Sequence, residues 1–184
     1  MKKQILLIIG AVIIVILGFG IYKFNFTNSD IYVQNGAQIN EHDGIYVVDG
    51  KVIILKNGIS EVEAAPGSAS KIITRYFGND IESDLNADGM KDRAFFITQQ
   101  TGGSGTFYYV VALLKTPNGN MGSHAFFLGD RIAPQSINME EGKDIVVVNY
   151  ADRKPTESFA VAPSEGKSVW LQLDIKTMKF SKVK

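Results

Sequence analysis

Residues 44–63, GIYVVDGKVIILKNGISEVE, decide the fold class of this chain. Three runs rich in β-branched residues are separated by Asp49-Gly50 and by Asn57-Gly58. Both dipeptides accommodate the positive φ angles that two-residue hairpin turns require. The stretch therefore predicts a three-stranded antiparallel meander with strands at 44–48, 51–56 and 59–63.

Further strand-like runs continue toward the C-terminus. Residues 107–114, FYYVVALL, are apolar on both faces, which predicts a central strand covered on each side. The turn residues Pro-Asn-Gly-Asn at 117–120 make the next run its expected hairpin partner. The other predicted strands are 93–99, 124–128, 143–150, 169–175 and 179–183. We therefore expect a mainly β, antiparallel, hairpin-rich domain.

Residues 69–77 fit two structures. Ile72, Ile73, Tyr76 and Phe77 would share one face of a helix that ends at the following glycine. The same residues are β-branched or aromatic, as strands favour. We favour a strand, and an α+β domain is the alternative.

The N-terminus carries an uncharged apolar run, residues 5–22. As a helix these 18 residues would span ~27 Å, close to the ~30 Å hydrocarbon core of a bilayer. Lys2 and Lys3 precede the run, and Lys23 follows it. The positive-inside bias then keeps the N-terminus in the cytoplasm. We predict a single-pass membrane anchor over residues 1–24, with 4–22 in the membrane.

A cleaved signal peptide is the alternative. The apolar core Ile5–Leu17 has a suitable length, and Gly18-Phe19-Gly20 is a small-x-small site. Glycine is a poor substitute for alanine there, and the apolar run continues past it, so we prefer the anchor over secretion after cleavage near Gly20. Both possibilities place a polar tether, residues 25–43, and a β-rich domain, residues 44–184, outside the cytoplasm. We expect one short strand at 31–33 within the tether.

Composition excludes several function classes. Beyond residue 24 the chain holds 19 acidic and 16 basic residues, a formal charge of −3. This balance argues against a nucleic-acid partner. The chain has no cysteine, which excludes disulfides, thiolate catalysis and Cys-ligated zinc.

Residues 84–92, DLNADGMKD, contain the most specific motif. Oxygen-bearing side chains occupy positions one, three, five and nine, and glycine occupies position six. This spacing brings hard oxygen ligands to one point, while the glycine permits a sharp bend, so it predicts a Ca²⁺ site. The predicted ligands are the side chains of Asp84, Asn86, Asp88 and Asp92 and the backbone carbonyl of Met90.

The loop is not an EF-hand. Position twelve is Phe95 rather than a bidentate glutamate, and the loop leads into a predicted strand. It resembles the aspartate-rich calcium loops of FG-GAP repeats. Without the glutamate we expect a Kd of ~10⁻⁴–10⁻³ M. The alternative is a surface turn whose Asx side chains bond their own backbone.

Other motifs favour structural roles. The glycine-rich stretch 101–106 leads into a strand, so we interpret it as a strand connection rather than a phosphate loop. Asp130-Arg131 and Asp152-Arg153 each follow a predicted strand. Because successive residues of an extended chain point in opposite directions, we expect each to contact neighbouring loops rather than one another.

Several motifs in fixed order resemble a group of uncharacterised exported bacterial proteins. These are residues 65–70 (APGSAS), the 84–92 loop, 102–109 (GGSGTFYY), 127–132 (FLGDRI) and 149–153 (NYADR). The similarity covers about residues 44–175. It implies export and one compact domain, and it implies no activity.

The expected function is therefore a membrane-anchored binding module of the cell envelope that is stabilised by calcium. Its expected partners are the membrane and an envelope protein or glycan. One alternative is a hydrolase of envelope polymer that uses acidic residues of the loop or of the 130–152 region. Another is a scaffold that acts through its transmembrane helix. The missing histidine triad and zinc ligands weigh against an enzyme.

Overall fold

The computed structural model describes residues 32–34 and 40–183, which belong to a compact unit, Tyr32–Lys184. The predicted anchor lies outside the described residues. In the part of the chain that is described, no helix is long and apolar enough to cross a membrane. The described residues are 58% strand and contain no helix, so the expectation of a mainly antiparallel β domain is confirmed.

The strands follow in chain order. They are β1 (Tyr32–Gln34), β2 (Ile45–Val48), β3 (Lys51–Ile54), β4 (Ile59–Glu63), β5 (Lys71–Ser83), β6 (Asp92–Gln100), β7 (Phe107–Thr116), β8 (Gly119–Gly122), β9 (Phe126–Asp130), β10 (Ala133–Met139), β11 (Val146–Asp152), β12 (Glu165–Asp174) and β13 (Lys179–Lys182).

The main sheet has the order β1-β8-β7-β6-β5-β4, with β9 also paired to β7. Strands β8 and β9 share one edge of β7, because β8 pairs with its C-terminal half and β9 with its N-terminal half. Ser123 lies between them and bonds Ala112 twice, through its backbone N–H (2.9 Å) and through its hydroxyl (2.8 Å). The predicted 124–128 strand is thus paired to β7 as expected, but a separate short strand precedes it.

The β2–β3 hairpin covers one face of the main sheet. Side chains alternate in a strand, so every second residue of β6 and β7 faces the hairpin. This core contains Tyr46, Val48, Ile53, Leu55, Phe95, Ile97, Tyr109, Val111 and Leu113. The hairpin is attached at the break between β8 and β9, where the Ala125 N–H donates to the Val47 carbonyl at 2.7 Å.

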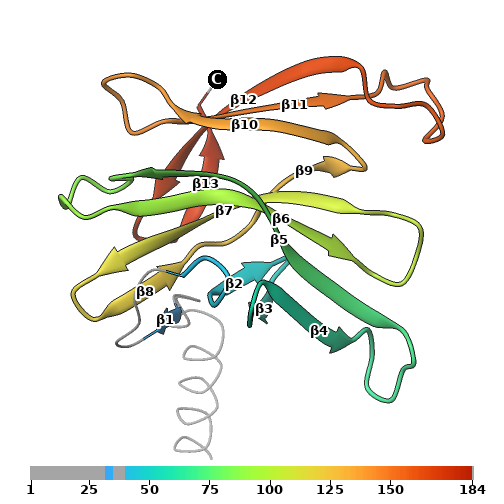
Figure 1. Ribbon diagram of the computed structural model, residues 1–184, viewed down its shortest axis with the longest axis horizontal. Coiled ribbons are helices and arrows are strands. Elements are labelled where there is room, and N and C mark those ends of the chain that lie inside the picture. Colours follow the sequence, from blue (N-terminus) through green and yellow to red (C-terminus); the bar gives the residue numbers. More distant parts are fainter. Residues whose placement is uncertain (1–31, 35–39, 184) are drawn as a thin grey trace, which may run out of the picture. The chain divides into compact units, whose positions relative to one another are not determined.

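A second sheet, β10-β11-β12-β13, lies over the opposite face. In Figure 1, β10, β11 and β12 lie on one side of β5, β6 and β7, and β2 and β3 lie on the other. On this second face Phe96, Val110 and Ala112 are fully buried. The expectation that β7 is a central strand covered on both sides is confirmed.

The predicted meander is only partly correct. Strands β2 and β3 pair around Asp49-Gly50 as expected, but β4 joins the main sheet and pairs with β5. The only bridge between the second and third predicted strands is Lys56–Ile59, at the Asn57-Gly58 turn. The longer β5 offers β4 five paired positions and an ion pair between Lys71 and Glu61 (3.1 Å), which the short β3 cannot match.

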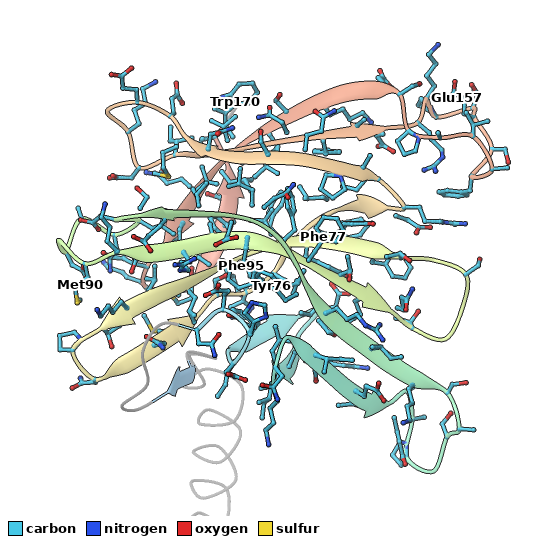
Figure 2. All side chains as sticks on the ribbon, viewed as in Figure 1. Tyr76, Phe77, Met90, Phe95, Glu157 and Trp170 are labelled. Carbon is cyan, nitrogen blue, oxygen red and sulfur yellow. The ribbon has the colours of Figure 1, made fainter. Side chains whose placement is uncertain are left out.

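Residues 69–77 lie in strand β5 and not in a helix. The Tyr76 ring contacts that of Phe95 on one face of the sheet, whereas the adjacent Phe77 contacts Phe96 edge-to-face on the other. Figure 2 shows Tyr76 and Phe77 pointing to opposite sides of β5. Adjacent side chains on opposite faces are what a strand produces. The glycine proposed as a helix end, Gly78, is instead at a β-bulge with φ of 112°.

Two parts of the predicted tether pair with the domain. Strand β1 pairs with β8, close to the short strand expected at 31–33. Residues 40–43 form a turn that bonds the β3–β4 connection, where the Gly58 N–H donates to the His42 carbonyl at 2.7 Å. The described parts of the polar segment are therefore bonded to the domain through their backbone.

Candidate functional site

The 84–92 loop connects β5 to β6 and is held by its own side chains. The Asp84 carboxylate accepts N–H donors from Asn86 (3.3 Å), Asp88 (3.2 Å) and Gly89 (2.8 Å). These backbone donors, Gly89 foremost, hold the pKa of Asp84 below its ordinary value because they stabilise the charged form.

The next two predicted ligands repeat this pattern. The Asn86 side-chain oxygen accepts the Asp88 N–H at 3.2 Å, and Asp88 accepts the Met90 N–H at 2.8 Å. The Asn86 amide also donates to the Asp88 carboxylate at 2.9 Å. Ala87 and Gly89 adopt positive φ angles of 60° and 83°, and these angles direct the backbone N–H groups of the loop toward its own side-chain oxygens.

Asp92 differs from the other predicted ligands because it is fully buried. One of its carboxylate oxygens accepts the Leu85 N–H at 2.9 Å, and the other accepts the Lys115 N–H at 2.8 Å. Burial raises the pKa of Asp92, and the nearby carboxylates of Asp88 and Asp84 raise it further. Asp92 therefore fastens the loop to the end of β7.

The donor set of the loop is made of hard oxygens, which suits Ca²⁺. Each of its three carboxylates also accepts backbone N–H groups, as the alternative of a self-bonded Asx turn requires. Among residues 40–183 no group of three or more His, Cys, Asp or Glu side chains is gathered closely enough to hold a metal ion. Figure 2 shows Met90 at the tip of this loop. The calcium site stays a prediction.

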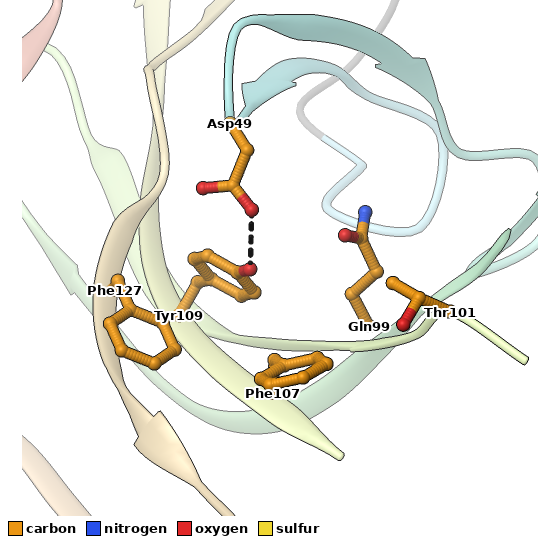
Figure 3. A pocket seen from close by; sticks show the side chains of 6 residues that line it. All are labelled: Asp49, Gln99, Thr101, Phe107, Tyr109 and Phe127. Carbon is orange, nitrogen blue, oxygen red and sulfur yellow. Dashed lines mark hydrogen bonds between the residues drawn. The ribbon is translucent and has the colours of Figure 1, made fainter. Parts of the chain in front are cut away.

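A pocket of about 460 Å³ lies at the other end of β6 (Figure 3). It is lined by Asp49, Gln99, Thr101, Phe107, Tyr109 and Phe127. At ~3.3 Å per strand residue, Gln99 is about 23 Å from Asp92 along β6. The loop and the pocket are therefore separate sites.

Strand alternation and the short hairpin together create the pocket. Gln99 and Phe107 are cross-strand partners, and so are Tyr109 and Phe127. The Gln99 and Tyr109 side chains lie on the same face of the sheet as the core residues of β6 and β7, at the end of that face. The hairpin that covers this face ends at the turn residue Asp49, so the last row of side chains is left uncovered.

One side of the pocket is aromatic. The Tyr109 and Phe127 rings lie 5.4 Å apart at 58°, and the Phe107 and Phe127 rings lie 6.4 Å apart at 49°. Phe127 is 52% exposed although it is a large apolar residue, so its ring surface is accessible. Exposed aromatic surface beside a pocket is available for stacking on a ligand.

The other side of the pocket is polar. The Tyr109 hydroxyl donates to Oδ2 of Asp49 at 2.8 Å, and burial together with this bond raises the pKa of Tyr109, so the hydroxyl stays protonated at neutral pH. The Gln99 amide is buried and donates to the Thr74 hydroxyl at 3.1 Å. These bonds fix both polar groups in position.

Asp49 is the only charged residue that lines the pocket. In the described part of the chain no ion pair includes its carboxylate. A smaller pocket of about 230 Å³ also borders Asp49, and Lys179 and His124 line that one. The larger pocket therefore holds one carboxylate with no paired cation.

Asp130 and Asp152, two acids of the 130–152 region considered for hydrolysis, each pair with a basic side chain. Asp130 accepts the Thr106 N–H of the glycine-rich stretch at 2.9 Å, as the predicted loop contact requires, but it also forms an ion pair with the adjacent Arg131 at 2.7 Å, so the prediction that the two neighbours do not contact one another is wrong. Arg131 has a φ of 50°, so the chain turns at this residue and does not keep the extended conformation that the prediction assumed. The second pair follows the prediction, because Asp152 binds Lys167 at 2.8 Å while Arg153 donates to a neighbouring carbonyl.

Sequence reasoning missed the pocket residues. It interpreted Asp49 only as a hairpin-turn residue and Phe107 and Tyr109 only as part of a central strand. Thr101 belongs to the glycine-rich stretch that was interpreted as a connection. The one indication in the sequence is that Gln99 and Thr101 lie close to a strand that begins with three aromatic residues. This pattern does not indicate which face of the sheet the hairpin leaves uncovered.

No protein-family model, curated protein or solved structure matches the chain.

Proposed function

We propose that this protein is a binding module of the cell envelope, anchored by residues 4–22, and that the pocket at the open end of the β2–β3 hairpin is its ligand site. Ca²⁺ would serve as a structural ion of the 84–92 loop. The observation that carries the proposal is the pocket itself, with three aromatic rings facing three polar side chains.

The size and lining of the pocket support ligand binding. Small-molecule sites usually measure about 300–1,000 Å³ and combine apolar surface with a few well-placed polar groups. This pocket has about 460 Å³, and Tyr109 and Gln99 are fixed by hydrogen bonds before any ligand enters. Fixed groups lose little conformational freedom on binding, which favours affinity.

The lining supports binding rather than glycoside hydrolysis. That reaction generally needs two carboxyl groups about 5–9.5 Å apart across the scissile bond. Asp49 is the only carboxylate that lines the pocket. Asp130 and Asp152 are each neutralised by a basic side chain.

The test is binding of small probes to the full chain, kept in a polyoxyethylene detergent that carries neither charge nor sugar. The probes are tetramethylammonium, glucose, N-acetylglucosamine and benzoate, and NMR shifts of the pocket amides report binding. We expect at least one probe to bind, and Phe127→Ala to weaken it several-fold because the ring surface is lost.

Phe159→Ala is the matched control. Phe159 is 55% exposed against 52% for Phe127, but it lies outside the pocket lining and packs on Arg131. Its removal should leave probe binding unchanged. If none of the four probes shifts the pocket amides, or if both variants weaken binding equally, the pocket is not a ligand site.

Anchoring is tested by mass spectrometry of the mature protein. A chain that still begins at Met1 or Lys2 supports the anchor. A start near Ile21 contradicts it and favours secretion.

A further inference from the structure

We infer that the pocket lined by Asp49, Phe107, Tyr109 and Phe127 binds an organic ammonium group. This inference rests on the proposed function, because it names the ligand class of the same site. It follows from the charge of the lining, from the orientation of its donors and from the chemistry of its aromatic side.

The pocket lining has one negative charge, and no cation of the lining pairs with it. Asp49 contributes one carboxylate, and the other five lining residues are uncharged. The Tyr109 hydroxyl donates to Oδ2, and in the described residues no hydrogen bond reaches Oδ1. The site therefore presents an open acceptor with a full negative charge, which favours a cationic ligand and disfavours an anion.

Two of the donors of the lining are already in use. The Tyr109 hydroxyl proton is directed to Asp49, and the Gln99 amide donates to the Thr74 hydroxyl. A neutral polyol both donates and accepts hydrogen bonds through each hydroxyl, so it needs donors as well as acceptors. Of the lining side chains, the Thr101 hydroxyl and the second Gln99 N–H remain as donors for such a ligand, whereas a cation is attracted by the Asp49 carboxylate as well.

The aromatic side adds attraction for a cation. Aromatic rings carry negative charge density on their faces, and a cation within about 6 Å of a ring centroid is attracted to it. The centroid of the Phe127 ring lies 5.4 Å from that of Tyr109 and 6.4 Å from that of Phe107. Figure 3 shows these rings on the same pocket as the Asp49 carboxylate. Aromatic rings together with a carboxylate are the combination that alkylated ammonium groups bind.

The experiment compares choline with 3,3-dimethylbutan-1-ol, its uncharged carbon isostere. The full chain is titrated in the polyoxyethylene detergent, and NMR shifts of amides at residues 49–50, 99–101 and 107–109 report binding. We expect choline to bind at least about tenfold more tightly than the isostere, since the two differ only in charge.

Asp49→Asn is the decisive variant. It removes the charge, keeps an acceptor for the Tyr109 hydroxyl and suits the φ of 50° at this turn position, because asparagine readily adopts such angles. Choline affinity should fall about tenfold, to that of the isostere. Asp144→Asn removes the same charge from an exposed turn residue outside the pocket and should change nothing.

The outcomes separate this inference from the proposed function. Equal binding of choline and its isostere, or unchanged choline binding in Asp49→Asn, overturns the ammonium assignment. Glucose or N-acetylglucosamine binding without choline overturns it too, but keeps the pocket as a ligand site. If no probe shifts the pocket amides, both are overturned.

Discussion

The acidic residues near the two ends of β6 are in opposite circumstances. At its start, the carboxylates of the 84–92 loop accept backbone N–H groups of the same loop, and Asp92 is buried with both oxygens bonded. At its end, Asp49 is exposed, bonds a single hydroxyl and faces aromatic rings. The carboxylates of the loop are therefore used to hold the loop itself, whereas the Asp49 carboxylate can still bind a ligand.

The difference follows from how each site is assembled. The loop is a contiguous motif, so its side chains accept mostly from residues two to seven positions away, and only Asp92 also accepts from the distant Lys115. The pocket combines the β2–β3 turn with β6, β7 and β9, and it exists because a hairpin of two four-residue strands ends before the sheet face does. A specific sequence motif therefore does not indicate which acidic side chain remains available to bind a ligand.

The largest expected effect concerns Asp92→Ala. This change leaves the buried N–H of Leu85 and the partly buried N–H of Lys115 without an acceptor, so it should lower the free energy of unfolding by about 3 kcal/mol. Urea unfolding of the full chain measures the loss. Asp88→Ala, at an exposed position, should lose much less. Equal losses would show that Asp92 does not fasten the loop.

Calcium should have the next largest effect. With a Kd of ~10⁻⁴–10⁻³ M, 10 mM Ca²⁺ would stabilise the folded chain by about 1–3 kcal/mol. Thermal unfolding should show a higher Tm with Ca²⁺, and Asp88→Ala should abolish the shift. Asp174→Ala removes a comparable Asx turn outside the loop and should retain it. If calcium does not change the Tm of the wild-type chain, the loop is a self-bonded turn and not a calcium site.

Tyr109→Phe should have a smaller effect at the other end of β6. It removes the hydroxyl that donates to Asp49, so it should cost about 1 kcal/mol of stability. A double-mutant cycle with Asp49→Ala isolates the pair. Additive losses in that cycle would mean that the bond does not position the carboxylate.

The smallest expected effect is the titration of Asp84. Its pKa lies below the ordinary 3.8 because the Gly89 N–H, with other loop donors, stabilises the carboxylate. Its contribution to stability is therefore present above pH 3.8 and is lost as the pH falls through the lower folded-state pKa. The Gly89 amide shift should titrate with a midpoint below 3.8. Asp84→Asn should remove this titration, and a midpoint at or above 3.8 would contradict the bonding of the loop.

Much of the local structure could be predicted from the sequence. The Asp49-Gly50 turn, the central strand at β7 and the strand over residues 71–77 follow from turn chemistry and side-chain type. Two strands were missed. Strand β8 contains two glycines among its four residues, and β10 begins with Ala-Pro; both lack the β-branched pattern that marks a strand.

Tertiary pairing is harder to predict because it depends on partners distant in the chain. Nothing within residues 59–63 indicates that β4 pairs with β5 rather than β3. The edge position of β10 tolerates Pro134, since an edge strand leaves some N–H groups unpaired. Such choices follow from competition among strands for pairing.

The sequence by itself determined the β class, the turns and the acidic loop, because these depend on residues close together in the chain. Only the tertiary structure decided that Asp49 meets Tyr109 sixty positions away and that Phe127 completes an aromatic side. The physical reason is that strand pairing and hairpin length set which side chains remain uncovered, and neither quantity is encoded in any single stretch of the chain.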